Sequence, residues 1–114
     1  MAARRQAVVL AGGLGSRLGA RAQALPKYLV EVGGRPFAAW QLERLAAVGF
    51  EEVVLCIGHL GGAIVAALGD GTGHRLQLRY SDEGERRLGT GGALAEAAAM
   101  LDDTFLLTYG DSLL

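Results

Sequence analysis

Short apolar segments alternate along the chain with longer segments whose apolar residues recur every three or four positions. Continuous apolar runs, such as the one at residues 7–10, are typical of strands buried on both faces of a sheet. Apolar residues at helical spacing before a glycine, as before Gly49, predict helices. The predicted order is a strand at 7–10, a helix at 37–48, a strand at 52–57, a helix at 60–68, a strand at 76–80, a helix at 94–101 and a strand at 105–109.

The predicted strand at residues 76–80 differs from the others because its apolar and polar side chains alternate. Alternation is typical of an edge strand with one wet face. Strands that alternate with helices predict an α/β fold with a mainly parallel sheet and right-handed crossovers. Such a sheet usually continues on the far side of its first strand, so we expect residues 1–114 to be the N-terminal part of a domain whose C-terminal part is absent.

The composition predicts a globular domain without a surface for polyanions. Of the 114 residues, 51% are hydrophobic and 20% are charged, so a packed core is expected. The net charge of −1 gives no support for binding nucleic acid or an anionic membrane. No apolar run approaches the roughly 20 residues that cross a bilayer, so a cytoplasmic location is predicted. Cys56 lies in an apolar run and is expected to be a buried, inert thiol.

A glycine-rich turn after the first strand is the most informative motif. Gly12, Gly13 and Gly15 follow the strand, and Arg17 and Lys27, the only lysine, come next. Glycines let backbone N–H groups approach phosphate oxygens, and two cations complete the neutralisation of charge. The pattern lacks the Gly-Lys-Ser/Thr ending of a P-loop and the third glycine of a dinucleotide fingerprint. The glycines together with Arg17 and Lys27 instead predict a site for a nucleoside triphosphate and a second phosphate. A purely structural turn is the alternative.

Other candidates lie at predicted strand ends and helix starts. Asp111 follows the last strand and is either a Mg²⁺ ligand beside phosphates or a turn residue. The turn at 88–92 precedes the third helix and either lies against a base or ribose or is only a flexible helix entry. Glu83 and Glu85 precede this turn and could reach a base edge, but we expect them to be solvated loop carboxylates. Two isolated histidines and one cysteine predict no zinc site.

Four segments together resemble the N-terminal half of a sugar-1-phosphate nucleotidyltransferase: LAGGLGSRL, LPKYLVEVGGRPF, LGTGGAL and LLTYGDSLL. The resemblance covers nearly the whole chain, in the order and at the approximate spacing of that family. The LGTGGA and YGDS segments most resemble the D-glycero-D-manno-heptose 1-phosphate guanylyltransferase branch, with cytidylyl- and uridylyltransferases close to it. The resemblance implies a Rossmann-like fold with helices on both faces of the sheet.

The resemblance also implies roles for individual residues. Arg17 would stabilise the departing pyrophosphate, Lys27 would draw the sugar phosphate and the α-phosphate together, and Asp111 would bind Mg²⁺. The remaining residues would hold the nucleotide: Leu10, Ala11, Gly12, Gly13, Gly15, Ser16, Gly89, Thr90, Gly91 and Gly92. Where the family often has a second proline after Pro-Lys, this chain has Tyr28, and we expect a small effect.

The implied reaction is in-line attack of a sugar 1-phosphate on the α-phosphorus of GTP, CTP or UTP, which yields a nucleotide-sugar and pyrophosphate. Two alternatives stay open: an inactive nucleotide-binding fragment or regulatory module, and a dinucleotide-binding oxidoreductase domain with Glu31 as the ribose-binding acid. The missing third glycine disfavours the second alternative. An unpaired edge strand is also consistent with a homo-oligomer.

Overall fold

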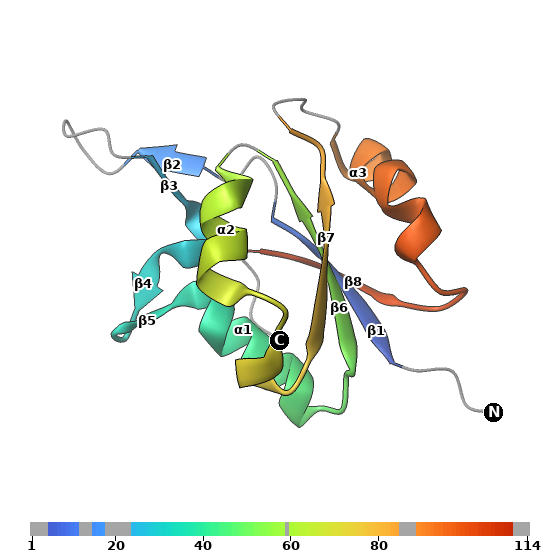
Figure 1. The fold of residues 1–114 in the computed structure, drawn as a ribbon, viewed down its shortest axis with the longest axis horizontal. Helices are drawn as coiled ribbons and strands as arrows, with labels where there is room; N and C mark the ends of the chain where they lie inside the picture. The colour runs from blue at the N-terminus through green and yellow to red at the C-terminus, as the bar shows by residue number, and fades with distance from the viewer. Residues whose placement is uncertain (1–4, 12–14, 18–23, 59, 85–88, 111–114) are drawn as a thin grey trace.

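The computed structural model describes residues 5–11, 15–17, 24–58, 60–84 and 89–110 of the chain. Its centre is a four-stranded parallel sheet with the order β7-β6-β1-β8 (Figure 1). The strands are β1 (Gln6–Leu10), β6 (Glu52–Ile57), β7 (Gln77–Asp82) and β8 (Leu106–Tyr109). The predicted parallel sheet is confirmed, and β7 is at one edge of the described sheet, as its alternating pattern predicts.

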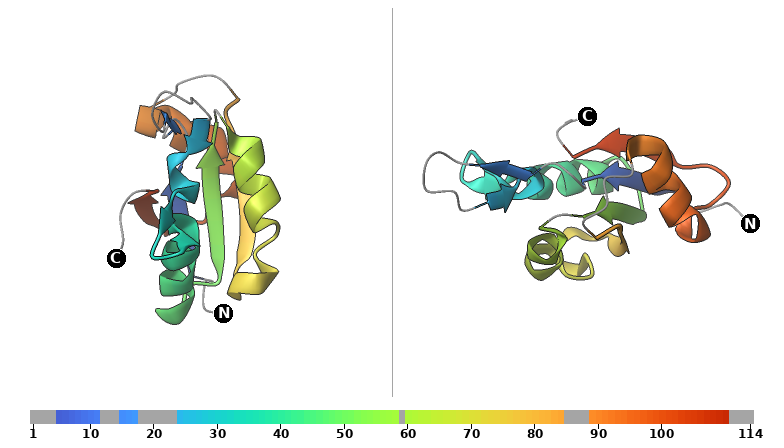
Figure 2. Two further views of the ribbon diagram at one scale, coloured as in Figure 1. Left: turned by 90° about the vertical axis from the view of Figure 1, so that its left-hand side faces the viewer. Right: turned by 90° about the horizontal axis from the view of Figure 1, so that it is seen from above.

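Three helices cover the sheet, with α1 (Phe37–Ala47) and α2 (Gly61–Leu68) on one face and α3 (Gly89–Ala97) on the other. Both views in Figure 2 keep α3 apart from α2, with strands of the sheet between them. Two-stranded antiparallel hairpins join β1 to α1. They are formed by β2 (Gly15–Arg17) with β3 (Ala24–Pro26), and by β4 (Glu31–Val32) with β5 (Arg35–Pro36). Single 3-10 turns follow β3, α2 and α3: η2 (Lys27–Leu29), η3 (Thr72–His74) and η4 (Ala98–Met100).

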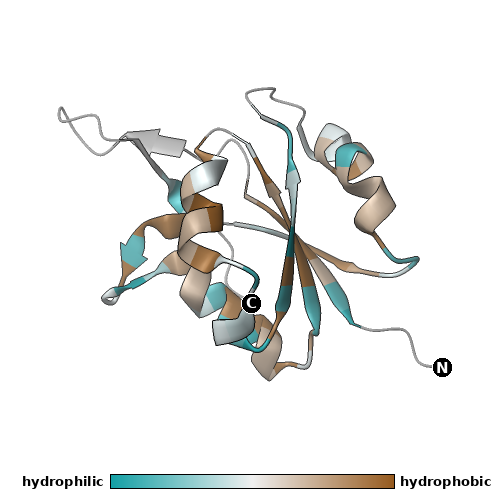
Figure 3. Ribbon diagram, viewed as in Figure 1, coloured by the Kyte–Doolittle hydropathy of each residue, from teal (hydrophilic) through white to brown (hydrophobic). Residues whose placement is uncertain are grey.

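The two central strands are apolar after their first residues, Gln6 and Glu52, because both of their faces are covered. In β1, Ala7 and Val9 pack toward α1 and α2, whereas Val8 and Leu10 pack toward α3. The same alternation holds in β6. Figure 3 shows hydrophobic residues in the middle of the sheet and hydrophilic ones at the start of β1, β6 and β7. Burial on both sides explains why continuous apolar runs predict these strands correctly.

The bounds of one predicted helix differ most from those in the structure, whereas the strand predicted at 76–80 is Gln77–Asp82 and the other elements agree to within one residue. The helix expected at residues 94–101 begins at Gly89 and ends at Ala97, where η4 replaces its last turn. Gly89, with a φ of +71°, is the residue through which the chain turns into α3, and the residues from Thr90 to Gly92 form the first turn of the helix. Glycine disfavours a helix by about 1 kcal/mol per residue. Burial of Ala93 and Ala97 against the sheet outweighs that preference.

Candidate nucleotide site at the carboxyl edge of the sheet

Backbone hydrogen bonds extend the sheet one residue beyond its strands, at their carboxyl edge. Ala11 N–H donates to the Cys56 carbonyl at 2.9 Å, and Gly110 N–H donates to the Leu10 carbonyl at 3.0 Å. Glu83 N–H donates to the Ile57 carbonyl at 2.9 Å. The residues that follow β1, β7 and β8 are thereby brought to one edge, where open parallel sheets bind their ligands.

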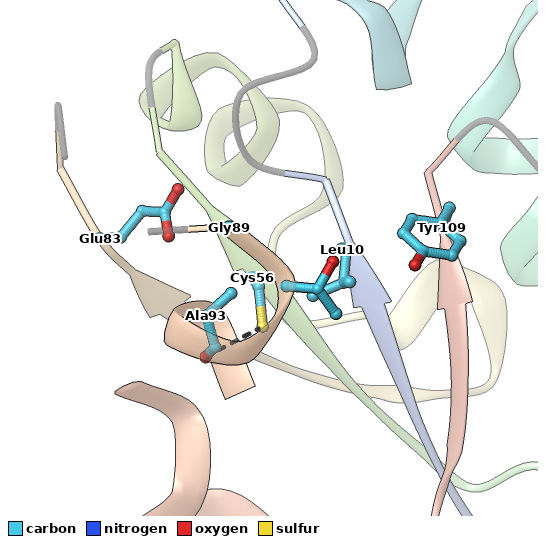
Figure 4. A pocket seen from close by; sticks show the side chains of 7 residues that line it. Leu10, Cys56, Glu83, Gly89, Ala93 and Tyr109 are labelled. Carbon is cyan, nitrogen blue, oxygen red and sulfur yellow. Dashed lines mark hydrogen bonds between the residues drawn. The ribbon is translucent and has the colours of Figure 1, made fainter. Parts of the chain in front are cut away.

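A cavity of about 210 Å³ opens at this edge (Figure 4). Its lining follows the order of the sheet, from Glu83 after β7 through Cys56 and Leu10 to Tyr109 in β8. The first residues of α3 close another side. The complete lining is Leu10, Cys56, Glu83, Gly89, Thr90, Ala93 and Tyr109. Three of these residues, Leu10, Gly89 and Thr90, are ones that the family resemblance assigns to the nucleotide. The fold thus brings together segments nearly eighty positions apart in the chain.

Glu83 has an environment that the sequence does not predict. The expectation of a solvated loop carboxylate is wrong, because Glu83 is only 8% exposed and lines the cavity. It packs against the backbone of Gly58, where a Cβ atom would stand 3.1 Å from the Glu83 Cγ atom. The available signal is alternation, since Ser81 is buried and Asp82 is exposed. Continued for one more residue, that alternation turns Glu83 inward.

Cys56 forms part of the cavity wall. Its thiol is buried, as expected, and its Sγ atom lies 4.0 Å from the Ala93 carbonyl oxygen. Burial, helped by the charge of Glu83, raises the pKa of the Cys56 thiol to about 11. A thiol with so high a pKa stays neutral at physiological pH and gives the cavity a small, apolar wall.

The β2–β3 hairpin brings the glycine-rich segment to the Pro-Lys pair. Gly15 pairs with Pro26, and Arg17 pairs with Ala24. Lys27 directly follows Pro26, which lies opposite Gly15. Lys27 and Gly15 are therefore close in space, although they are twelve positions apart in the chain. Lys27 is exposed at the start of η2. An exposed cation beside a glycine-rich segment is suited to bind an anion.

The other predicted site residues are placed only in part. Gly12, Gly13 and Asp111 lie outside the described residues, as do His59 and Glu85. For Ser16 and Arg17 the structure describes the strand but not the side chains. Ala11 is buried under the edge of the sheet and belongs to the cluster beside α1. Gly91 and Gly92 lie in α3, but only Gly89 and Thr90 of that segment are among the cavity residues described.

Two further observations concern only the part of the chain that the structure describes. No group of three or more histidine, cysteine, aspartate or glutamate side chains gathers there in a way that could hold a metal ion. No helix in the same part is long and apolar enough to cross a membrane.

A parallel sheet with helices on both faces and a cavity at its carboxyl edge defines the class of the protein as a Rossmann-like α/β domain. The chain belongs to the family of the MobA-like NTP transferase domain, which matches residues 7–114. It is 38% identical over 109 residues to the N-acetylmuramate alpha-1-phosphate uridylyltransferase of Neisseria meningitidis, covering 95% of this chain and 47% of that protein. It is 41% identical over 108 residues to the mannose-1-phosphate guanylyltransferase of Mycobacterium tuberculosis, covering 94% of this chain and 30% of the relative.

Solved structures give the same result. HddC from Yersinia pseudotuberculosis superposes with a TM-score of 0.82 at 29% identity, covering 96% of this chain and 48% of HddC. A second HddC structure, with a TM-score of 0.81, is a complex with GMP-PN. The chain thus spans half or less of the length of these relatives. The resemblance to sugar-1-phosphate nucleotidyltransferases and the Rossmann-like fold are both confirmed.

Proposed function

We propose that this chain is the nucleotide-binding part of an enzyme that transfers the nucleotidyl group of an NTP to a sugar 1-phosphate and releases pyrophosphate. The observation that carries the proposal is the carboxyl-edge cavity, which Gly89 and Thr90 line beside Leu10. Lys27 also supports the proposal, because it is exposed and directly follows Pro26, the residue that pairs with Gly15. Relatives named as uridylyl- and guanylyltransferases support the same reaction class.

The cavity would take the base, and the glycine-rich segment would take the phosphates. A buried carboxylate such as Glu83 accepts hydrogen bonds and suits a base edge that presents several donors. Guanine presents an N1–H group and an amino group side by side, so we favour GTP over CTP and UTP. The HddC complex with GMP-PN supports that choice for a protein of the same fold.

Mg²⁺ would enter with the nucleotide. The described residues contain no cluster of three ligating side chains, and Asp111 lies outside them. A single carboxylate such as that of Asp111 nonetheless fits Mg²⁺, because that ion is commonly held by one or two carboxylates together with phosphate oxygens and water. Asp111, directly after Gly110 at the carboxyl edge, would be the protein ligand. The bound ion would neutralise phosphate charge.

The chain's own residues would align two anions and neutralise their charge. Lys27 would draw the sugar phosphate toward the α-phosphate, and Arg17 would stabilise the departing pyrophosphate. A phosphate monoester is already ionised at pH 7, so the attack requires no general base.

We further propose a cytoplasmic location and, as one use of the sheet edges, a homo-oligomer. Both β7 and β8 are edges of the sheet formed by the described residues. An uncovered sheet edge can pair with another strand, whether from a continuation of the chain or from a second copy.

A thermal-shift panel tests the proposed function. The chain is heated with GTP, CTP, UTP, ATP, dTTP or NAD, each with and without Mg²⁺. Ligand at about a hundred times its Kd adds roughly 2.7 kcal/mol, which raises the Tm of a domain of this size by several degrees. We expect a Mg²⁺-dependent shift that is largest with GTP and smaller in the Lys27→Ala variant. A shift with NAD alone, or no shift with any nucleotide, would overturn the proposal.

Transfer itself is tested separately, by pyrophosphate release from GTP in the presence of a panel of sugar 1-phosphates. In a full-length version of the protein, Lys27→Ala is expected to lower the transfer rate by at least about a hundredfold, the size seen when a charge-stabilising group is removed from a transition state. Asp111→Asn should shift the Mg²⁺ titration of nucleotide binding to higher concentrations. An unchanged titration would show that Asp111 is a turn residue and not a Mg²⁺ ligand.

A further inference from the structure

Two neighbouring residues of η2 have opposite environments. Lys27 is exposed, whereas Tyr28 is 0% exposed and belongs to the cluster between the sheet and α1. The Tyr28 ring meets the ring of Phe37, the first residue of α1, edge to face, with ring centroids 6.4 Å apart and planes at 66°. Aromatic pairs favour this geometry, so the two rings restrain each other. The ring of Tyr28 thereby anchors the turn that begins with Lys27.

The backbone on either side of Lys27 is held as well. Val30 N–H donates to the Lys27 carbonyl at 3.2 Å, and Phe37 N–H donates to the Val30 carbonyl at 2.8 Å. On the preceding side, Pro26 pairs with Gly15. The lysine side chain is a flexible four-carbon stem, so the backbone turn sets where it starts. Its point of departure and initial direction therefore depend on the turn beneath it.

We propose that Tyr28 is a positioning residue for Lys27: its buried ring holds η2 against α1 and so fixes how Lys27 extends beside the glycine-rich segment. The ordering of Lys27 follows from the contacts above, while its consequence for phosphate binding rests on the proposed function. Tyr28 stands where the resembling family often has proline, which restrains a turn through its backbone. Here a side chain buried in the core takes over that restraint.

The ring, and not the hydroxyl, performs this role. The Tyr28 hydroxyl has no hydrogen-bond partner among the described residues. Burial raises the pKa of Tyr28 far above its usual value, with a further contribution from Tyr80, so the side chain is neutral at all ordinary pH values. A phenylalanine at this position is therefore expected to substitute fully for tyrosine, whereas leucine is not.

The order of Lys27 can be measured directly because the chain has a single lysine. Labelling with [15N]lysine leaves one backbone amide signal, and its heteronuclear NOE reports motion on the ps–ns timescale. We expect the NOE of the native protein and of Tyr28→Phe to be equally high, and that of Tyr28→Leu to fall toward values of a flexible loop. Should Tyr28→Leu fail to fold, Phe37→Leu removes the same ring contact from the α1 side and is expected to have the same effect.

Leu45→Ala is the matched control, because Leu45 is equally buried in the same cluster but lies in the second half of α1. It should lower stability without changing the Lys27 signal. An unchanged NOE in both Tyr28→Leu and Phe37→Leu would overturn the proposal. So would an equal loss of order in Leu45→Ala, since the effect would then be a general consequence of lower stability.

A second measurement connects order to binding, with GTP and Mg²⁺ as the probe in calorimetry, because GTP carries the α-phosphate assigned to Lys27. Lys27→Ala is expected to weaken GTP binding about tenfold, the usual loss for one charge-assisted contact. Tyr28→Leu should weaken it by several-fold, and the double variant should be no weaker than Lys27→Ala alone. Independent, additive effects would show that Tyr28 does not act through Lys27. If the native chain binds neither GTP nor any other nucleotide, the proposed function fails, and the NMR measurement still decides the positioning role.

Discussion

The side-chain amide of Gln41 donates a hydrogen bond to the backbone carbonyl of Tyr109, with Nε2 and O 2.8 Å apart. Gln41 is 0% exposed in α1, and Tyr109 is the last residue of β8, 68 positions further along the chain. The next residue, Gly110, donates its N–H to the Leu10 carbonyl. The carboxyl end of β8 is thus held by both a helix and a neighbouring strand, directly before the predicted metal ligand Asp111.

Replacing Gln41 by methionine tests this connection. The substitution keeps the volume but removes the donor to Tyr109, and we expect the free energy of unfolding to fall by about 1–2 kcal/mol. Urea denaturation measures the change. The matched control is Gln77→Met, because Gln77 is exposed at the start of β7 and should change stability by less than about 0.5 kcal/mol. Equal effects of the two substitutions would contradict a specific role for the bond.

Gly58→Ala is expected to weaken nucleotide binding without unfolding the protein. The new Cβ atom would lie 3.1 Å from both the Glu83 Cγ atom and the Gly84 carbonyl oxygen, and 3.2 Å from the Glu83 Oε1 atom, so Glu83 and its adjoining backbone must shift. We expect the affinity for the best nucleotide to fall about tenfold, measured by calorimetry, as for a lost contact to a charged group.

The control for Gly58→Ala is Gly62→Ala in α2. A Cβ atom at Gly62 meets no atom within 4 Å, and alanine favours a helix over glycine. Its stability should rise by about 0.4–1 kcal/mol with the nucleotide affinity unchanged. If both variants bind nucleotide like the native chain, Glu83 does not contribute to the nucleotide site.

Alkylation of Cys56 reports on the cavity from inside. The thiolate is the reactive form, and burial raises the pKa of Cys56 to about 11, so the native protein should react slowly at neutral pH. Between about pH 8 and pH 10 its rate should increase roughly tenfold per unit, whereas the urea-unfolded chain should level off above its ordinary pKa of about 8.5. Mass spectrometry with iodoacetamide measures both rates.

The same thiol tests whether the nucleotide occupies the cavity. Because the Cys56 side chain lines it, a saturating concentration of the nucleotide with the largest thermal shift should slow alkylation by at least about tenfold at a fixed pH. Cys56→Ser serves as the unreactive control. An unchanged alkylation rate at a saturating concentration of that nucleotide would instead locate the bound nucleotide away from this cavity.

Gly71→Ala should destabilise the fold strongly, whereas Gly73→Ala should not. Gly71 has a φ of +89°, and a Cβ atom there would collide with the Leu76 carbonyl oxygen and approach the Leu78 side chain to 2.7 Å. Gly73 lies two residues away in η3, and a Cβ atom there meets nothing within 4 Å. We expect a loss of about 2–3 kcal/mol for Gly71→Ala and less than about 0.5 kcal/mol for Gly73→Ala, by urea denaturation.

Local patterns predict those features whose cause is local. The buried strands β1 and β6 can be identified from their apolar runs, and β7 from its alternation, because the period of the apolar positions reports how many faces are covered. The helix α1 ends close to Gly49 as expected. The glycine-rich segment, Lys27 and the Gly-Asp pair indicate phosphate and metal chemistry because glycine, ammonium and carboxylate groups have few equivalents for those tasks.

Tertiary structure decided what depends on partners distant in the chain. Glu83 is buried because β7 pairs with β6 and turns that carboxylate into the cavity, and the glycines after Gly89 are helical because Ala93 and Ala97 pack on the sheet. Lys27 lies beside the glycine-rich segment only because β2 and β3 pair. The sequence by itself thus determined the elements and the chemical groups available. Which groups meet was decided by strand pairing and core packing, since contacts between distant segments form only when the whole sheet assembles.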